Sequence, residues 1–485
     1  MSQPAPPAYE TEHEVVIGLE VHCHLRTRSK LFSSAAVSYG DAPNQHVTEV
    51  CLALPGALPV LNGRAVELAI RAGLALNCKV HPTSVFARKN YFYPDLPKGY
   101  QISQFEEPLC TEGFLDIDVA GGTRRIGITR IHMEEDAGKS IHDGAATTLV
   151  DLNRSGVPLV EIVSEPDLRS AEEVGVYLRT LRQILRYVGA SDADMEKGQL
   201  RCDANVSLRR PGEDRLGTRR EIKNLNSFRN AEAAVRTEIE NQAERLGAGG
   251  RVVQATVGYE ADAGRIFVMR TKENADDYRY FPDPDLIPLT VPESRIDEIR
   301  KALPELPGVR CRRFVETLGL KDEDARVLTA SRELADWFEA AAAAHGSAQT
   351  VASWTRRDVL GALNDRDVEI DAVALAPAAF AALVKMTDEG RVTPRNARDL
   401  LGEILFEGGD PEALVREHGL EAVSDAGELE ALVDAAIAAN PRAVASYASG
   451  DKKSLNFLMG QVMKQTQGKA DPGSVREILA RKLGG

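Results

Sequence analysis

Hydrophobic and polar residues alternate along two stretches of the chain in the way that predicts half-buried β-strands. In the stretch 14–25 the apolar face carries Leu19, Val21 and Cys23, and the polar face carries Glu20, His22 and His24. A glutamate and an imidazole two residues apart on one face can reach the same point, although the solvent side of an antiparallel sheet has the same pattern. The stretch 200–208 alternates likewise and places Arg201, Asp203 and Asn205 on one face, a set able to contact a metal ion or a phosphate.

A third pattern holds most of the candidate chemistry. Isoleucines alternate with polar residues over 126–131, as in a half-buried strand, and the acidic run 134–136 follows. The apolar run 159–163 carries Glu161 in its middle, where a carboxylate needs a compensating cation or donor. One interpretation brings Glu135 and Glu161 together at Mg²⁺, which prefers carboxylate oxygens. The alternative makes the acidic run a solvated turn and gives Glu161 an arginine partner, and composition alone favours it.

Helical periodicity is clearest between residues 170 and 188. Ser170 and Glu173 form a capping box at its start, and Gly189 follows its end. An apolar stripe runs along one side, so this helix is expected to be scaffold.

The character of the chain changes after about residue 292, where Ala-, Leu- and Glu-rich segments of helical period replace the strand signals. The sequence therefore predicts a part with strands, followed by helical parts. The expected domains span residues 1–292, 293–409 and 410–485.

Two regions carry candidate contacts for phosphate. Basic and aromatic residues interleave over 88–100, and Arg88 and Lys89 suit a nucleotide there, although a surface loop with an aromatic anchor would look similar. From Gly450 onward seven Lys/Arg face three Asp/Glu, a local charge of +4 that suits a nucleic-acid backbone or a solvated helix face. The segment 136–140 imitates the end of a Walker-type loop, but Met133 stands where that loop needs glycine.

Composition narrows the class of protein. The chain has 485 residues, a net charge of -14 and no unbroken apolar run long enough to span a bilayer. The segment Met1–Tyr9 lacks the order of a secretory signal, so a cytoplasmic protein is expected. Six scattered cysteines without a paired metal spacing are expected to be reduced thiols.

Seven motifs in order resemble the B subunits of the aspartyl/glutamyl-tRNA amidotransferases, the GatB family. They occupy residues 18–22, 88–95, 132–140, 160–166, 200–205, 221–228 and 276–282. The resemblance implies an α+β fold, in which a cradle-shaped catalytic domain with a mixed or antiparallel sheet is followed by a helical domain and a tail domain similar to the YqeY family. It also implies the partners of a GatCAB heterotrimer, which are an amidase that releases ammonia and a small third protein. Misacylated tRNA(Gln) or tRNA(Asn) and a non-discriminating aminoacyl-tRNA synthetase are further implied partners.

In that family, the B subunit uses ATP and Mg²⁺ to phosphorylate the side-chain carboxylate of Glu-tRNA(Gln) or Asp-tRNA(Asn), and ammonia then displaces phosphate. A carboxylate resists ammonia until it carries a leaving group, which explains the need for ATP. The family's metal and catalytic cluster corresponds to Glu20, His22, Glu135, Glu161 and Asp203, with Lys89 facing phosphate. We expect His22, Glu135 and Glu161 as direct ligands and Glu20 and Asp203 as further ones.

The remaining candidate site residues come from the charge and alternation patterns described above. Expected contacts for the nucleotide are Arg88, Lys89, Arg201 and Asn205, and those for tRNA are Lys452, Lys453, Lys464 and Lys469. Some members carry Cys-x-x-Cys before a Leu-Pro-Gly turn, whereas here Thr48 replaces the cysteine that would precede Cys51, so no structural zinc is expected. The alternative functions are a tRNA-binding scaffold with catalysis in a partner, and a nucleotide hydrolase or kinase acting on a small molecule.

Overall fold

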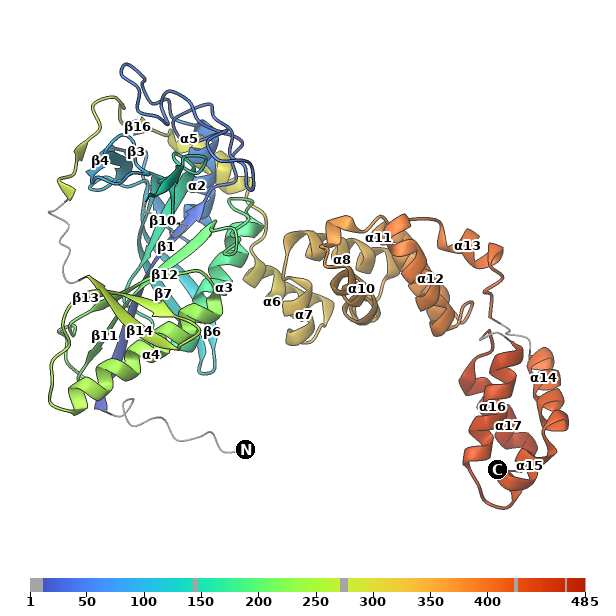
Figure 1. The fold of residues 1–485 in the computed structure, drawn as a ribbon. Coiled ribbons are helices and arrows are strands. Elements are labelled where there is room, and N and C mark those ends of the chain that lie inside the picture. Colours follow the sequence, from blue (N-terminus) through green and yellow to red (C-terminus); the bar gives the residue numbers. More distant parts are fainter. Residues whose placement is uncertain (1–11, 143–146, 271–277, 423–425, 467–468, 485) are drawn as a thin grey trace. The chain divides into compact units, whose positions relative to one another are not determined.

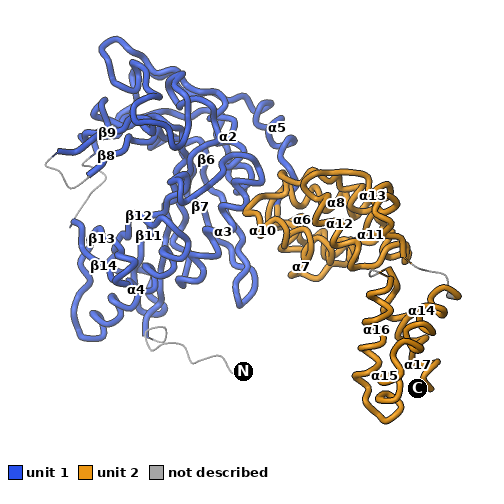
Figure 2. Tube along the Cα trace, turned by 45° about the vertical axis from the view of Figure 1, so that its right-hand side comes forward, with its two compact units in different colours: residues 1–306 blue, residues 307–485 orange. Residues whose placement is uncertain are grey.

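The computed structural model describes residues 12–142, 147–270, 278–422, 426–466 and 469–484, so the amino-terminal segment Met1–Tyr9 lies outside the described residues. The chain forms two compact units, residues 1–306 and residues 307–485 (Figure 2). None of the helices in the described ranges combines the length and apolar character that a membrane span requires.

A nine-stranded sheet organises the first unit (Figure 1). Its order is β14 (Arg265–Arg270), β13 (Ala255–Glu260), β12 (Arg220–Leu225), β11 (Leu200–Arg209), β1 (Glu14–His24), β10 (Pro158–Ser164), β7 (Gly122–Glu135), β6 (Cys110–Val119) and β2 (Lys79–Val80). Neighbouring strands are antiparallel except β12 and β13. The predicted α+β class with a mixed sheet is confirmed.

The alternation predicted for β1 is confirmed, and it separates a core face from a polar face. Leu19, Val21 and Cys23 are buried in the core, while the intervening polar residues are only partly buried. Helices α2 (Gly63–Ala75), α3 (Ala171–Tyr187) and α4 (Phe228–Gly247) pack on the sheet and share this core. The apolar stripe of the predicted helix 170–188 therefore faces the sheet as α3, and its capping serine Ser170 accepts the Glu173 N–H. The opposite, polar face of the sheet carries the candidate site residues of β1.

The acidic run does not form the solvated turn considered from composition. β7 continues through Glu135 because it remains paired with β10, with Glu134 opposite Leu159 and Glu135 opposite Pro158. All three acidic side chains of the run are buried. Successive residues of a strand point to opposite faces, so Glu134 and Glu135 are directed apart.

Smaller sheets and one helix complete the first unit. A three-stranded sheet joins β15 (Phe281–Pro282), β4 (Phe86–Asn90) and β5 (Tyr100–Gln104); two further pairs join β16 (Leu289–Thr290) with β3 (Thr83–Ser84), and β8 (Lys139–Ile141) with β9 (Leu149–Asp151). Helix α5 (Glu293–Lys301) adds Ile296 and Ile299 to the core, so this unit extends to residue 306 and beyond the expected boundary at 292.

The second unit is helical in its described residues, as predicted. Its elements are α6 (Pro307–Leu318), α7 (Asp322–Leu328), α8 (Arg332–His345), α9 (Ala348–Trp354), a π-helical turn (Thr355–Val359), α10 (Leu360–Arg366), a 3₁₀ turn (Ile370–Ala372), α11 (Pro377–Asp388), α12 (Pro394–Glu407), α13 (Pro411–Glu417), α14 (Ala426–Ala439), α15 (Pro441–Ala448), α16 (Lys453–Gln465) and α17 (Pro472–Leu483). Two separate cores lie within it, one from Phe314 to Val415 and one from Leu429 to Leu479. The division into two helical domains near residue 410 stays a prediction.

Candidate active site

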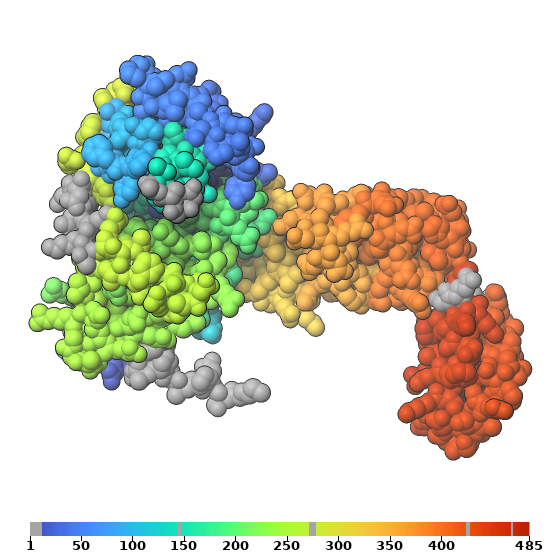
Figure 3. Space-filling view, in the orientation of Figure 1, coloured from blue at the N-terminus to red at the C-terminus, as the bar shows by residue number. Residues whose placement is uncertain are grey.

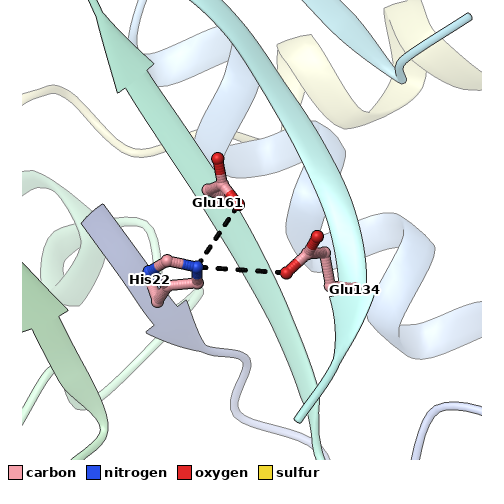
Figure 4. A group of neighbouring side chains, drawn as sticks. All are labelled: His22, Glu134 and Glu161. Carbon is pink, nitrogen blue, oxygen red and sulfur yellow. Dashed lines mark ion pairs between the residues drawn. The ribbon is translucent and has the colours of Figure 1, made fainter. Parts of the chain in front are cut away.

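Three side chains from adjacent strands converge on the polar face of the large sheet (Figure 4). His22 on β1 is paired with Glu161 on β10, and Glu134 comes from β7 on the other side of β10. The His22 Nε2 atom lies 3.3 Å from Glu161 and 3.9 Å from Glu134. One ligand atom from each residue lies within 4.8 Å of the others, a spacing that a single cation can bridge. Two carboxylates and an imidazole suit a hard or borderline divalent cation such as Mg²⁺ or Mn²⁺.

The electrostatics of this cluster keep its oxygens anionic. Burial disfavours the charged carboxylates, but the charges around them outweigh it: Lys89 chiefly lowers the pKa of Glu134 to about 2, and His132 chiefly lowers that of Glu161. His132 pairs with Glu161 across β7 and β10, and the two glutamates raise its pKa to about 9 despite burial. The hydrogen bond and charge of Glu161 likewise raise the pKa of His22 against burial. A raised pKa means that a histidine holds its proton more firmly, so a metal ion that binds a nitrogen of His22 would have to displace a proton.

Glu135 lies outside this cluster, and its expected placement beside His22 and Glu161 is wrong. Its carboxylate pairs with the Lys98 ammonium and accepts the Ile102 N–H at 2.9 Å. Because Glu135 follows Glu134 directly in a strand, it occupies the other face of β7. Glu134, and not Glu135, therefore lies beside His22 and Glu161.

The third acidic residue, Asp136, explains the position of Arg201. Asp136 lies 2.7 Å from His24, 2.8 Å from Arg201 and 3.3 Å from Arg154. Burial disfavours its charge, but these partners, Arg201 most strongly, hold the pKa of Asp136 far below its usual range. Arg201, an expected nucleotide contact, is therefore engaged by a buried carboxylate.

A cavity of about 310 Å³ opens beside the cluster. Its lining is mainly charged and aromatic: Glu20, Lys89, Gln104, Phe105, Arg130, His132, Glu161, Arg219, Glu221, Lys223, Gln254, Ala255, Thr256, Tyr278 and Tyr280. In the space-filling view the blue-to-cyan and the green-to-yellow segments of the first unit border a hollow (Figure 3). Four cationic side chains and a neighbouring carboxylate cluster suit a substrate that carries phosphate together with a metal ion.

Lys89 reaches this cavity, whereas Arg88 does not line it. The Lys89 ammonium lies 5.1 Å from the centre of the Tyr278 ring, and the nearby charge of Glu134 helps keep its pKa above the ordinary value despite burial. Arg88 is held 2.9 Å from Asp283 and stacks 4.1 Å over the Tyr100 ring. The alternation of β4 separates these two expected nucleotide contacts.

Glu20, Asp203 and Asn205 form a second polar group next to the cluster. Glu20 is paired with Asp203 across β1 and β11 and accepts a hydrogen bond of 3.2 Å from Asn205. Asp203 accepts the Lys223 ammonium at 3.0 Å and the Asn224 N–H at 3.1 Å. Burial first, and then neighbouring carboxylates, raise the pKa of Glu20. This group adjoins the three-residue cluster but has its own partners.

Several residues of the cavity are not among those expected from the sequence. His132 and Glu134 lie two residues apart in β7, the same signal that singled out Glu20 and His22, and this signal could have found them. Arg130 approaches Glu161 at 4.0 Å, so Glu161 has an arginine partner as well as its two histidines. Arg219 and Phe105 carry no local signal that sets them apart.

In the second unit, the expected tRNA contacts lie on or beside α16. Lys452, Lys453 and Lys464 are exposed, and Lys469 is half-buried. Phe457 is 50% exposed and lies on the same side of the helix as Lys453 and Lys464, because residues three, four or seven apart share a helix face.

Comparisons with known proteins match nearly the whole chain. Residues 15–297 match the GatB/GatE catalytic domain family, and residues 336–483 match the GatB domain family. The B subunit of the aspartyl/glutamyl-tRNA(Asn/Gln) amidotransferase of Oleidesulfovibrio alaskensis is 52% identical over 474 residues, covering 98% of this chain and 100% of that protein. The B subunit of the same enzyme from Persephonella marina is 51% identical over 473 residues, covering 97% of this chain and 100% of its own. At this identity and coverage, the chain belongs to the family of aspartyl/glutamyl-tRNA(Asn/Gln) amidotransferase B subunits.

Proposed function

We propose that this protein catalyses the ATP-dependent amidation of misacylated Glu-tRNA(Gln), Asp-tRNA(Asn) or both, giving Gln-tRNA(Gln) and Asn-tRNA(Asn). The observation that carries the proposal is the His22, Glu134 and Glu161 cluster at the edge of a cavity lined by cations. The side-chain carboxylate of the aminoacyl group must be activated before ammonia can attack it. Transfer of the γ-phosphoryl group of ATP supplies that activation.

The cluster has the donors that a divalent cation requires. His22, Glu134 and Glu161 would hold Mg²⁺, and both glutamates are buried and kept ionised by neighbouring cations. When bound, the ion would neutralise charge on the phosphates and orient them. Glu20 and Asp203, which are paired with each other across β1 and β11, would support the site from one side.

The cavity residues bind and orient the substrates. Lys89, Arg130, Arg219 and Lys223 supply positive charge for phosphate oxygens. The Phe105 and Tyr280 rings stack with their centres 4.2 Å apart and give the cavity an aromatic wall suited to a nucleobase. The partners in this proposal are an amidase that supplies ammonia and a small third protein, working in the cytoplasm beside the synthetase that misacylates the tRNA.

Ammonium should replace the amidase in this reaction. A complex whose amidase nucleophile is inactivated, supplied with ATP, Mg²⁺, misacylated tRNA and ammonium chloride, is expected to form amidated tRNA. The reason is that activation and amide formation both occur in this protein, while the amidase only delivers ammonia. The measurement is the fraction of aminoacyl-tRNA converted, read after nuclease digestion and chromatography.

The Glu134→Gln variant of the same complex is the matched control and should form product at least about 100-fold more slowly. Absence of product from both complexes, with assembly intact and tRNA bound, would return this protein to the role of a tRNA-binding scaffold.

We further propose that α16 binds the phosphate backbone of the tRNA. Reversing the charge at Lys452 and Lys453 together should raise the KM for aminoacyl-tRNA by about 10-fold, because phosphate contacts dominate such binding. The logarithmic salt slope of tRNA binding should fall by roughly one unit for each lost contact. Filter binding across a salt series measures the slope.

The control reverses two exposed lysines elsewhere in the second unit, Lys321 and Lys385, and so makes the same change in net charge. If both double variants weaken binding equally, the effect reports net charge and α16 is not the binding face. A truncation should begin at residue 426 rather than at 410, since Val415 belongs to the core of the preceding helices.

A further inference from the structure

A buried lysine and a buried cysteine meet outside the candidate active site. Lys30 is 1% exposed and Cys51 is 7% exposed. The Lys30 ammonium donates to the Leu152 carbonyl at 3.0 Å and lies 3.5 Å from the Cys51 sulfur. The hydroxyls of Ser33 and Thr48 lie 3.4 Å and 3.5 Å from the same sulfur. The thiol therefore sits among one cation and two hydroxyl groups.

Lys30 needs a counter-charge that carboxylates do not provide at close range. A buried ammonium is costly unless it is paired. In the described part of the chain, Lys30 forms no ion pair with a carboxylate within 4.0 Å, and the charges of Glu135 and Asp151 act only from farther away. The sulfur of Cys51 is the nearest group that can become an anion. This geometry favours a thiolate paired with the ammonium.

The other cysteines provide an internal comparison. Burial raises the pKa of Cys23 and of Cys78 to about 12, and raises those of Cys110 and Cys202 as well. Burial also disfavours the Cys51 thiolate, but hydrogen bonds from Ser33 and Thr48 and the charge of Lys30 outweigh it and lower its pKa. Thiolates, not thiols, react with peroxides, so these sites should differ in reactivity.

We propose that Cys51 is an oxidation site for peroxides, and that Lys30 captures the oxidised sulfur in a covalent nitrogen–sulfur bond. Val50 and Ala53, which lie in the same turn as Cys51, line a cavity of about 230 Å³ on the neighbouring surface.

The chemistry balances with hydrogen peroxide as the oxidant. The thiolate attacks one peroxide oxygen, the O–O bond breaks, and a sulfenic acid forms while the hydroxide that leaves takes a proton from the Lys30 ammonium. The neutral amine then attacks the sulfur, the S–O bond breaks, and water leaves with the proton lost from nitrogen. In sum, the ammonium, the thiolate and one hydrogen peroxide give the sulfenamide and two waters. The sulfur is oxidised and the peroxide is reduced.

The test treats the full-length protein with hydrogen peroxide and follows each cysteine by mass spectrometry. Cys51 should react at least about 10-fold faster than the four buried cysteines with raised pKa values. The protein should lose about 2 Da, a protease digest should link the Lys30 and Cys51 peptides, and dithiothreitol should reverse the link. The Cys51→Ser variant should show neither change.

Two variants test whether the reactivity of Cys51 depends on its neighbours Lys30 and Thr48 or only on how accessible its sulfur is to the oxidant. Lys30→Met keeps the length of the buried side chain but removes its charge and nucleophile, so oxidation should slow and any sulfenic acid should persist as an adduct of about 16 Da that dimedone traps. Thr48→Val removes one of the two hydroxyl groups that lie beside the Cys51 sulfur. It should slow oxidation less than Lys30→Met does, and the bond between Lys30 and Cys51 should still form. The proposal is overturned if Cys51 in the native protein reacts with peroxide no faster than the four cysteines with raised pKa values. It is also overturned if the folded Lys30→Met variant oxidises Cys51 at the native rate. A native protein that forms only higher oxides of Cys51 without the link also overturns it.

Discussion

Replacing Glu134 with glutamine is expected to lower amide formation by about 100-fold or more, because the variant loses an anionic oxygen from the proposed metal site. The loss should be accompanied by a rise of about 10-fold or more in the Mg²⁺ concentration that gives half-maximal activity. Amidation by the assembled complex, measured across a Mg²⁺ series, tests both expectations. Glu134 also accepts hydrogen bonds from Ser103 at 2.6 Å and Gln101 at 3.1 Å, so the folding of the variant must be verified by thermal unfolding.

Glu135→Gln is the informative comparison, since the two glutamates are neighbours in sequence and point to opposite faces of β7. It breaks the pair with Lys98 but leaves the three-residue cluster intact, so its Mg²⁺ dependence should remain close to that of the native enzyme even if its rate falls. Glu165→Gln, at an exposed position, should change neither quantity. A shifted Mg²⁺ dependence in Glu135→Gln together with a native dependence in Glu134→Gln would reverse the assignment.

Replacing Asp136 with asparagine is expected to destabilise the first unit by roughly 3 kcal/mol at neutral pH. Removing one partner of a buried ion pair costs about 3–5 kcal/mol, and Arg154 and Arg201 are partly exposed, which places the cost at the lower end. Both tryptophans, Trp337 and Trp354, belong to the second unit. Their fluorescence therefore serves as a control, and hydrogen exchange of β7 and β10 peptides measures the first unit.

The destabilisation caused by Asp136→Asn should become smaller as the pH falls. The pKa of Asp136 lies below that of an unfolded aspartate, so its ionised form stabilises the fold at neutral pH. This stabilisation is lost as pH falls below about 4 toward the folded-state pKa. The difference between the native protein and Asp136→Asn should therefore shrink on acidification. A difference that is constant between neutral pH and the acidic range would show that the lost contribution is packing rather than charge.

Much of the local structure could be predicted from the sequence because it depends on neighbours along the chain. The alternation in 14–25 correctly assigned Leu19 and Val21 to the core and His22 to the polar face of β1. The capping box at Ser170 located the start of α3 for the same reason, since both partners lie within one turn of helix. The helical character after residue 306 follows from periodicity that each segment carries by itself.

Only the tertiary structure decided which candidate residues meet. The acidic run contains two adjacent glutamates, and local pattern does not determine whether the strand continues through them. Pairing with β10 carries β7 through Glu135, which directs Glu134 to His22 and Glu161, and sends Glu135 to Lys98. A shift of one residue in this register would exchange the two side chains.

The same physical reason explains why other candidate residues lie together or apart. Arg88 and Lys89 are adjacent cations whose roles differ because β4 turns one toward Asp283 and the other toward the cavity. Lys30 and Cys51 are paired only through the folded chain, and no spacing rule connects them. The sequence by itself determined which faces are apolar and which residue types are available for chemistry. Strand register and long-range contacts decided which of those residues share a site, because each depends on partners far away along the chain.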